Sequence, residues 1–124
     1  MTKNTEKKKI VDLQNISKSF YLEGGVEVPV LHHIDLSVYE GDMIAILGPS
    51  GSGKSTLMNI IGGLDVATSG SYYFDGEQVD RMISNELAEL RSTNISFIFQ
   101  SFHILPGKTV YQNVMLPLIY QRSF

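Results

Sequence analysis

The first forty residues alternate apolar and polar positions, and this alternation predicts two β-strands. The strands cover residues 10–20 and 28–38, with a turn, LEGG, at residues 22–25 between them. Alternation is typical of strands that bury one face and expose the other to water. Pro29 lacks a backbone N–H, which places the start of the second strand near a sheet edge.

Two later apolar runs show no alternation. They are MIAIL, residues 43–47, which follows a tight turn at residues 40–42, and ISFIF, residues 95–99. Short uninterrupted apolar runs are typical of strands that are covered on both faces, as in a parallel sheet. We therefore expect both runs to be buried strands. Another strand is predicted over residues 71–76, SYYFDG, which ends in an Asp-Gly turn.

Three segments carry apolar residues at helical spacing. One follows residue 53, one covers residues 84–91, and one starts at Thr109, a candidate N-cap. Gly62 and Gly63 are expected to end the first helix, and Pro117 lies where it would bend the third. The apolar positions of the first helix are Leu57, Met58, Ile60, Ile61 and Leu64.

Composition narrows the classes of function. The chain has 124 residues, enough for one domain or less, and 43% of them are apolar, enough for a core. It has no cysteine, so neither a disulfide framework nor a thiolate metal site is expected, which fits a cytosolic protein. The net charge of −3 argues against nucleic acid as a partner.

The domain is expected to span residues 10–124, after a tail of nine residues. This tail, MTKNTEKKK, is polar and contains four lysines, a composition that predicts a disordered basic segment. The longest purely apolar run, residues 43–47, is far shorter than the roughly 20 residues that cross a bilayer as a helix.

Residues 48–55, GPSGSGKS, fit the phosphate-binding loop G-x-x-x-x-G-K-[ST]. The loop lies between a predicted strand and a predicted helix, which is the context that this motif requires. Backbone N–H groups of such a loop point at a polyphosphate, and glycines allow the necessary φ angles and the close approach. A chance glycine-rich turn with a solvated lysine is the alternative. The agreement of motif, strand and helix favours nucleotide binding.

The residue types suggest a role for each part of this P-loop. The lysine places a point charge on the β- and γ-phosphates, and the serine after it offers a hydroxyl ligand to Mg²⁺. The N-terminus of the following helix adds unpaired N–H groups and its dipole. The predicted nucleotide-binding residues of the loop are Gly48, Pro49, Ser50, Gly51, Ser52, Gly53, Lys54, Ser55 and Thr56.

Gln100 comes directly after the predicted strand at residues 95–99. The carboxyl ends of parallel strands are where open α/β sheets place ligands. A glutamine there is neutral, accepts a hydrogen bond from water and can ligate Mg²⁺. Hydrogen bonding within its own loop is the other interpretation of a glutamine at this place.

The order of these features resembles the first half of an ATP-binding-cassette (ABC) transporter ATPase. The features are an aromatic residue in the first strand, the P-loop, GGLD followed by TSG, a strand ending in DG, and a strand followed by glutamine, the Q-loop. The segments FQSFHILP and NVMLPL resemble the branch of lipoprotein-releasing and macrolide-export ATPases. The resemblance implies an α/β fold, a P-loop NTPase core with an N-terminal antiparallel β subdomain, truncated after the Q-loop.

The resemblance also implies ATP and Mg²⁺ as cofactors. Lys54 and Gln100 would be catalytic, and Ser55 and Gln100 would contact the metal. Phe20 falls where the family stacks an aromatic side chain on adenine. Tyr21 is a rival for that role, and packing against the core is the other interpretation of Phe20.

The implied partners are transmembrane permease subunits and a second ATPase subunit. The permease would contact residues 100–118, with Phe102, Ile104 and Leu105 as apolar contacts. The implied location is cytoplasmic, peripheral to the inner face of the cell membrane. Lys108 and Gln112 depart from the apolar residue and the glutamate that the family would have there.

The 124 residues lack three parts of the family's catalytic apparatus. They contain no stretch like LSGGQ, no apolar strand ending in Asp-Glu and no switch histidine. We therefore expect this half by itself to bind ATP without hydrolysing it, and the two unalternating runs to be short of neighbouring strands. A nucleotide-binding module without turnover and a different P-loop ATPase remain as alternatives.

Overall fold

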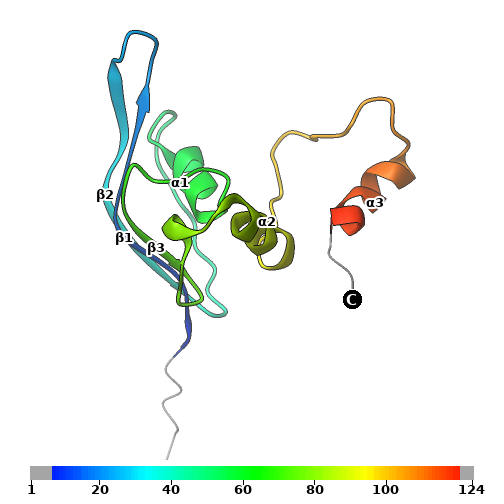
Figure 1. Cartoon of the computed structure of the whole chain (residues 1–124), viewed down its shortest axis with the longest axis horizontal. Helices are drawn as coiled ribbons and strands as arrows, with labels where there is room; N and C mark the ends of the chain where they lie inside the picture. Colours follow the sequence, from blue (N-terminus) through cyan, green and yellow to red (C-terminus); the bar gives the residue numbers. More distant parts are fainter. Residues whose placement is uncertain (1–6, 121–124) are drawn as a thin grey trace, which may run out of the picture. The chain divides into compact units, whose positions relative to one another are not determined.

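A computed structural model describes residues 7–120 of the chain (Figure 1). The chain divides after Met82 into two compact units, which are described separately. Of the predicted tail, residues 1–6 lie outside the described residues. Lys7 and Lys8 form ion pairs with Asp42 and Asp75, and Lys9 begins the first strand.

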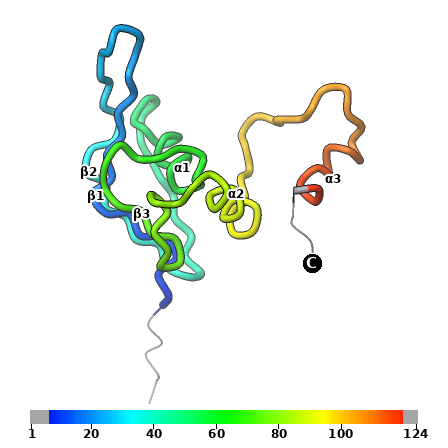
Figure 2. The backbone as a smooth tube through the Cα atoms, viewed as in Figure 1, coloured from blue at the N-terminus to red at the C-terminus, as the bar shows by residue number. Residues whose placement is uncertain are grey.

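The first unit is built on a four-stranded antiparallel sheet with the order β2-β1-β3-β4. The path of the chain through β1, β2 and β3 can be followed in Figure 2. Strands β1 (Lys9–Tyr21) and β2 (Glu27–Tyr39) form a long hairpin, as the alternation predicted. Strand β3 (Ser69–Phe74) pairs with the other side of β1, and a turn through Asp75 and Gly76 leads to β4 (Glu77–Gln78). Both turn residues have positive φ, which confirms the predicted Asp-Gly turn.

A bulge keeps the apolar residues of β1 on one face. Leu13 pairs with Leu36 and Ile16 pairs with Ile34, so the register shifts between them. Asn15 takes a positive φ of 54°, and its backbone N–H donates to the Asp35 carboxylate at 2.8 Å. Without this extra residue, everything beyond Leu13 would turn to the opposite face.

Helix α1 (Lys54–Ile61) lies beside the sheet and supplies Leu57 and Ile60 to the core. It ends at Gly62, as predicted. The hydroxyl of Tyr72, on β3, donates to the carbonyl of Ile61 at 2.6 Å and fastens the end of the helix to the sheet. The buried apolar residues of this unit are Val11, Leu13, Ile16, Leu31, Leu57, Ile60, Tyr72 and Val79, the last in a short 3₁₀ turn (Val79–Arg81).

The second unit contains helices α2 (Ser84–Thr93) and α3 (Val110–Tyr120). Both occur where helical spacing predicted them, and α3 contains Pro117. Thr109 caps α3: its hydroxyl accepts the backbone N–H of Gln112 at 3.2 Å, and the Gln112 side-chain oxygen accepts the backbone N–H of Thr109 at 3.0 Å. Gln112 thus completes a capping box with Thr109.

The prediction of buried strands at residues 43–47 and 95–99 is wrong. Neither segment has strand hydrogen bonding, and Met43, Leu47 and Ile98 expose at least 89% of their surface. A strand needs a hydrogen-bonded neighbour along at least one edge, and burial needs other elements packed over its faces. No strand in the part of the chain that the structure describes pairs with either segment.

Candidate functional site

The P-loop runs irregularly from Gly48 to Gly53 and passes directly into α1. Gly53 has a φ of 88° at the N-cap of the helix. A Cβ atom there would lie 2.8 Å from the Leu31 side chain and 3.1 Å from the Val30 carbonyl oxygen. Glycine is therefore required at this position for both its φ and the close approach of β2.

Lys54 is folded back onto the loop that precedes it. Its ammonium donates to the carbonyl oxygens of Gly48 at 2.8 Å and Pro49 at 2.6 Å, and it lies 3.3 Å from the Ser52 hydroxyl. These bonds join the Lys54 side chain to the start of the loop. The lysine side chain is only partly exposed, so the loop holds this charge in a defined place.

The N-terminus of α1 has the chemistry of an anion site. Its N-cap is a glycine that provides no side-chain hydrogen bond, and its first turn contains no acidic residue. The first N–H groups of a helix lack intrahelical partners and carry the positive end of the dipole. Exposed loop residues surround this end: Pro49, Ser50, Gly51, Ser52 and Ser55, with Thr56 half-buried.

These residues offer the charge and the N–H donors that a polyphosphate needs, but they offer few ligands to Mg²⁺. The described residues contain no group of three His, Cys, Asp or Glu side chains that could hold a metal. Ser55 contributes one exposed hydroxyl, and Mg²⁺ takes six oxygen ligands. A magnesium ion at Ser55 would therefore take its other ligands from phosphate oxygens and water.

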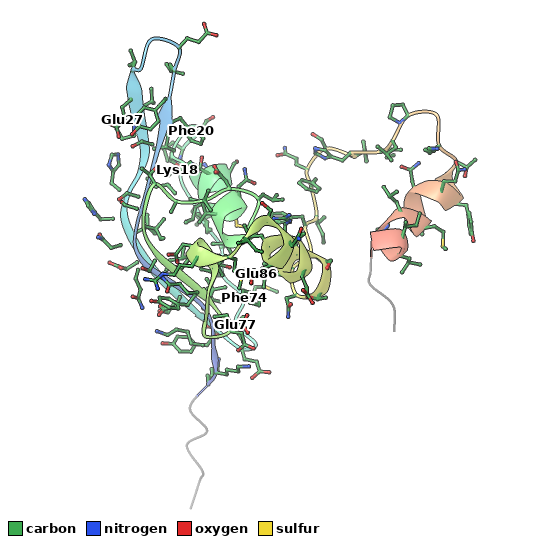
Figure 3. All side chains as sticks on the ribbon, in the orientation of Figure 1. Lys18, Phe20, Glu27, Phe74, Glu77 and Glu86 are labelled. Carbon is green, nitrogen blue, oxygen red and sulfur yellow. The ribbon has the colours of Figure 1, made fainter. Side chains whose placement is uncertain are left out.

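Phe20 lies near the end of β1, where it pairs with Val28. It exposes 42% of its surface, so the structure does not bury it in the core. The ammonium of Lys18 lies 4.9 Å from the centroid of its ring (Figure 3). Tyr21, the rival aromatic, is 65% exposed.

Sequence reasoning missed Lys18, which is only 9% exposed. The available signal was its place in the strand, two residues before Phe20 and two after Ile16. Alternate residues of a strand share a face, so a lysine here stands on the apolar side.

Gln100 lies in the second unit, in the segment between α2 and α3, and its side chain is exposed. Aromatic rings lie beside it: Phe97 stacks on Phe99 with the ring centroids 5.5 Å apart, and the Phe99 ring is tilted against the His103 ring, with the centroids 4.4 Å apart. The P-loop and Phe20 both belong to the first unit. The predicted roles of Gln100 in catalysis and metal binding stay predictions.

The second unit also exposes the apolar residues that were expected to meet a permease. Phe102 is 91% exposed, Ile104 62% and Leu105 43%. None of the helices in the described part of the chain is both long and apolar enough to cross a membrane.

The antiparallel sheet, the P-loop and α1 together have the arrangement of a P-loop domain, and comparison with known proteins gives its family. Residues 31–123, more than half of the chain, match the family described as "ABC transporter". The chain therefore belongs to the ABC transporter family, as the order of its motifs predicted.

Among curated proteins, the ABC transporter ATP-binding protein YvrO of Bacillus subtilis is 54% identical over 91% of this chain and 49% of its own length. The macrolide export ATP-binding/permease protein MacB of Marinobacter nauticus is 50% identical over 90% of this chain and 17% of its own length. The chain thus spans about half of YvrO and a smaller part of MacB. These relatives confirm the predicted macrolide-export branch.

The solved structure of the dimeric cassette MJ0796, in a post-hydrolysis state bound to ADP and Pi, is 40% identical. The two share a TM-score of 0.85 over 93% of this chain and 50% of that one. The match confirms the predicted fold class, the N-terminal part of an ABC ATPase.

Proposed function

We propose that this chain is the ATP-binding part of an ABC transporter, and that it holds Mg-ATP through its P-loop. In the complete protein, hydrolysis of that ATP would drive transport across a membrane. We assign the phosphate contact to Lys54 and the contact with Mg²⁺ to Ser55 and Gln100. Gln100 would sense the γ-phosphate through the metal or the attacking water.

The observation that carries the proposal is the closed P-loop at the start of α1. Lys54 is anchored by the carbonyl oxygens of Gly48 and Pro49, and the N-cap glycine leaves the first helical N–H groups to a ligand. Phosphate groups need this combination of fixed positive charge and backbone donors. Bound Mg²⁺ would neutralise phosphate charge, while the protein residues hold and orient the nucleotide.

The relatives support the same function and suggest partners. YvrO is named as an ATP-binding protein, MacB joins ATP-binding and permease parts, and MJ0796 was solved as a dimer. We infer that this chain pairs with a second ATPase subunit and with permease subunits through residues 100–118. It would then lie on the cytoplasmic side, peripheral to the inner face of the cell membrane.

Calorimetric titration of Mg-ATP into the protein and its Lys54→Ala variant tests the proposal. Hydrogen bonds to charged groups contribute about 1.5–3 kcal/mol, so we expect the dissociation constant to rise at least about tenfold. Lys9→Ala is the matched control, because it removes a lysine that pairs with Asp12 at the start of β1. Equal affinity in the Lys54 variant and the unaltered protein would refute the phosphate role of the loop.

A further inference from the structure

Lys18 is the buried charge of the first unit, and three groups surround its ammonium. The Asp65 carboxylate and the Val66 carbonyl oxygen each accept a hydrogen bond from it at 2.7 Å. The Phe20 ring lies 4.9 Å away, within the range at which a cation is attracted to an aromatic face (Figure 3). A lysine in this position is fixed by two oxygen acceptors and faces a ring.

The segment after α1 is fastened to β1 on both sides of Lys18. The backbone N–H of Thr68 donates to the Ser17 carbonyl at 2.9 Å, and the Thr68 hydroxyl accepts the backbone N–H of Ser19 at 3.0 Å. Residues 65–68 therefore form a rigid support behind the strand. The Lys18 ammonium contacts this segment through Asp65 and the Val66 carbonyl oxygen, and it contacts the ring of Phe20.

Exposure increases along this face of β1 toward the hairpin turn. Ile16 is fully buried, Lys18 is 9% exposed and Phe20 is 42% exposed. The cation lies over one part of the ring at 4.9 Å from its centroid, while the residue remains 42% exposed. An aromatic ring that is held on one side and open on the other is suited to stacking on a planar base.

We propose that Lys18 is a positioning residue that holds the Phe20 ring for stacking against the base of a bound nucleotide. The inference rests on the proposed ATP-binding function. Lys18 acts through Phe20, with Asp65 and the Val66 carbonyl holding its ammonium in place. Its loss should therefore weaken the part of the affinity that comes from the base and leave the phosphate part unchanged.

The experiment compares two ligands, Mg-ATP and Mg-tripolyphosphate, which lacks a base. Lys18→Met keeps the length of the side chain and removes its charge. Because Phe20 is 42% exposed, its cation–π interaction with Lys18 is expected to contribute about two- to fivefold in ATP affinity, which the variant should lose. Affinity for tripolyphosphate should not change, and a general structural defect would lower both.

Further variants separate positioning from folding. Lys18→Arg should keep the preference for ATP, because a guanidinium also binds an aromatic face. Asp65→Asn keeps the lysine and an oxygen acceptor but removes the negative charge that holds the ammonium. It should lower the preference for ATP over tripolyphosphate even if Lys18→Met fails to fold. Lys9→Met is the matched control on the same strand and should leave both affinities unchanged. Thermal unfolding of each variant reports on its folding.

A double-mutant cycle tests whether Lys18 acts through Phe20. In a Phe20→Leu background, Lys18→Met should cause no further loss of ATP affinity, because the ring that it positions is gone. Additive losses would overturn the inference, and so would equal loss for both ligands. If the unaltered protein binds neither ligand, the proposed function itself fails and this inference fails with it. If it binds both equally, only the inference is overturned.

Discussion

At the scale of single residues, Phe20 and Tyr21 are the two candidates for stacking on the base of a nucleotide. Phe20→Ala should weaken ATP and GTP binding alike, since stacking uses the face of a base and not its hydrogen-bonding edge. Stacking is worth about 1–3 kcal/mol per base, so the dissociation constants should rise by about fivefold or more. Fluorescence or calorimetric titration with both nucleotides measures this.

Tyr21→Ala is the matched control for that measurement. Tyr21 is the neighbouring aromatic, is 65% exposed and follows Phe20 on the opposite face of the strand. We expect its loss to leave both affinities unchanged. The reverse result, with Tyr21→Ala weakening binding and Phe20→Ala having no effect, would give the stacking role to Tyr21.

Single residues also show what a sequence can and cannot predict. The P-loop was predictable because its chemistry is local: glycines, a lysine and hydroxyls must occur at fixed spacing. The support behind Phe20 was not, because it depends on a contact between Lys18 and Asp65, which are 47 positions apart in the sequence. Alternation places Lys18 on the apolar face but does not say which carboxylate neutralises it.

At the scale of elements, helices and hairpins followed their patterns, whereas the two unalternating runs did not. A helix completes its hydrogen bonds within itself, and the hairpin of β1 and β2 pairs neighbours in the sequence. Residues 43–47 and 95–99 have the composition of buried strands, but burial requires partner strands from elsewhere. Composition therefore predicted what these runs need, whereas the expectation that neighbouring strands are lacking came from the family resemblance.

The bond between Tyr72 and α1 gives a prediction at this scale. Tyr72→Phe removes the hydroxyl that donates to the Ile61 carbonyl. Because the residue is only 3% exposed, the carbonyl is left without that partner and unfolding free energy should fall by about 1–3 kcal/mol. Urea unfolding measures this. Tyr73→Phe, the neighbour on the opposite face, is the control and should cost less, because its half-buried hydroxyl can bond to water.

The unaltered protein and Tyr72→Phe should differ in unfolding free energy, and the pH dependence of this difference tests whether burial of the phenol contributes to it. Burial raises the pKa of the Tyr72 phenol above its ordinary value of 10.0, so the folded protein keeps this proton when the unfolded chain loses it. The associated stability is fully present below pH 10.0 and is lost as the pH rises beyond that value. The gap between the unaltered protein and Tyr72→Phe should therefore narrow in alkaline solution. A gap that stays constant would mean that Tyr72 titrates as an exposed phenol.

At the scale of the whole molecule, ATP binding and ATP hydrolysis are expected to depend on different sets of residues. The first unit contains the P-loop and Phe20, while the second contains Gln100 and the exposed residues Phe102, Ile104 and Leu105. The 124 residues include no signature stretch and no Asp-Glu strand. We expect ATP binding to use the P-loop and Phe20, whereas hydrolysis also needs groups that place the water and stabilise developing charge.

We therefore predict that the 124-residue chain binds Mg-ATP but releases phosphate at a rate near background. Loss of a group that stabilises the transition state costs on the order of 100-fold or more in rate. In a longer protein that adds a signature stretch and an Asp-Glu strand, hydrolysis should appear. There, Gln100→Ala should lower the rate without abolishing ATP binding, and Gln78→Ala, a glutamine of β4, should not. A phosphate-release assay with Lys54→Ala as the blank measures all of these. Robust release from the 124 residues alone that disappears in Lys54→Ala would show that this half carries its own group for activating water.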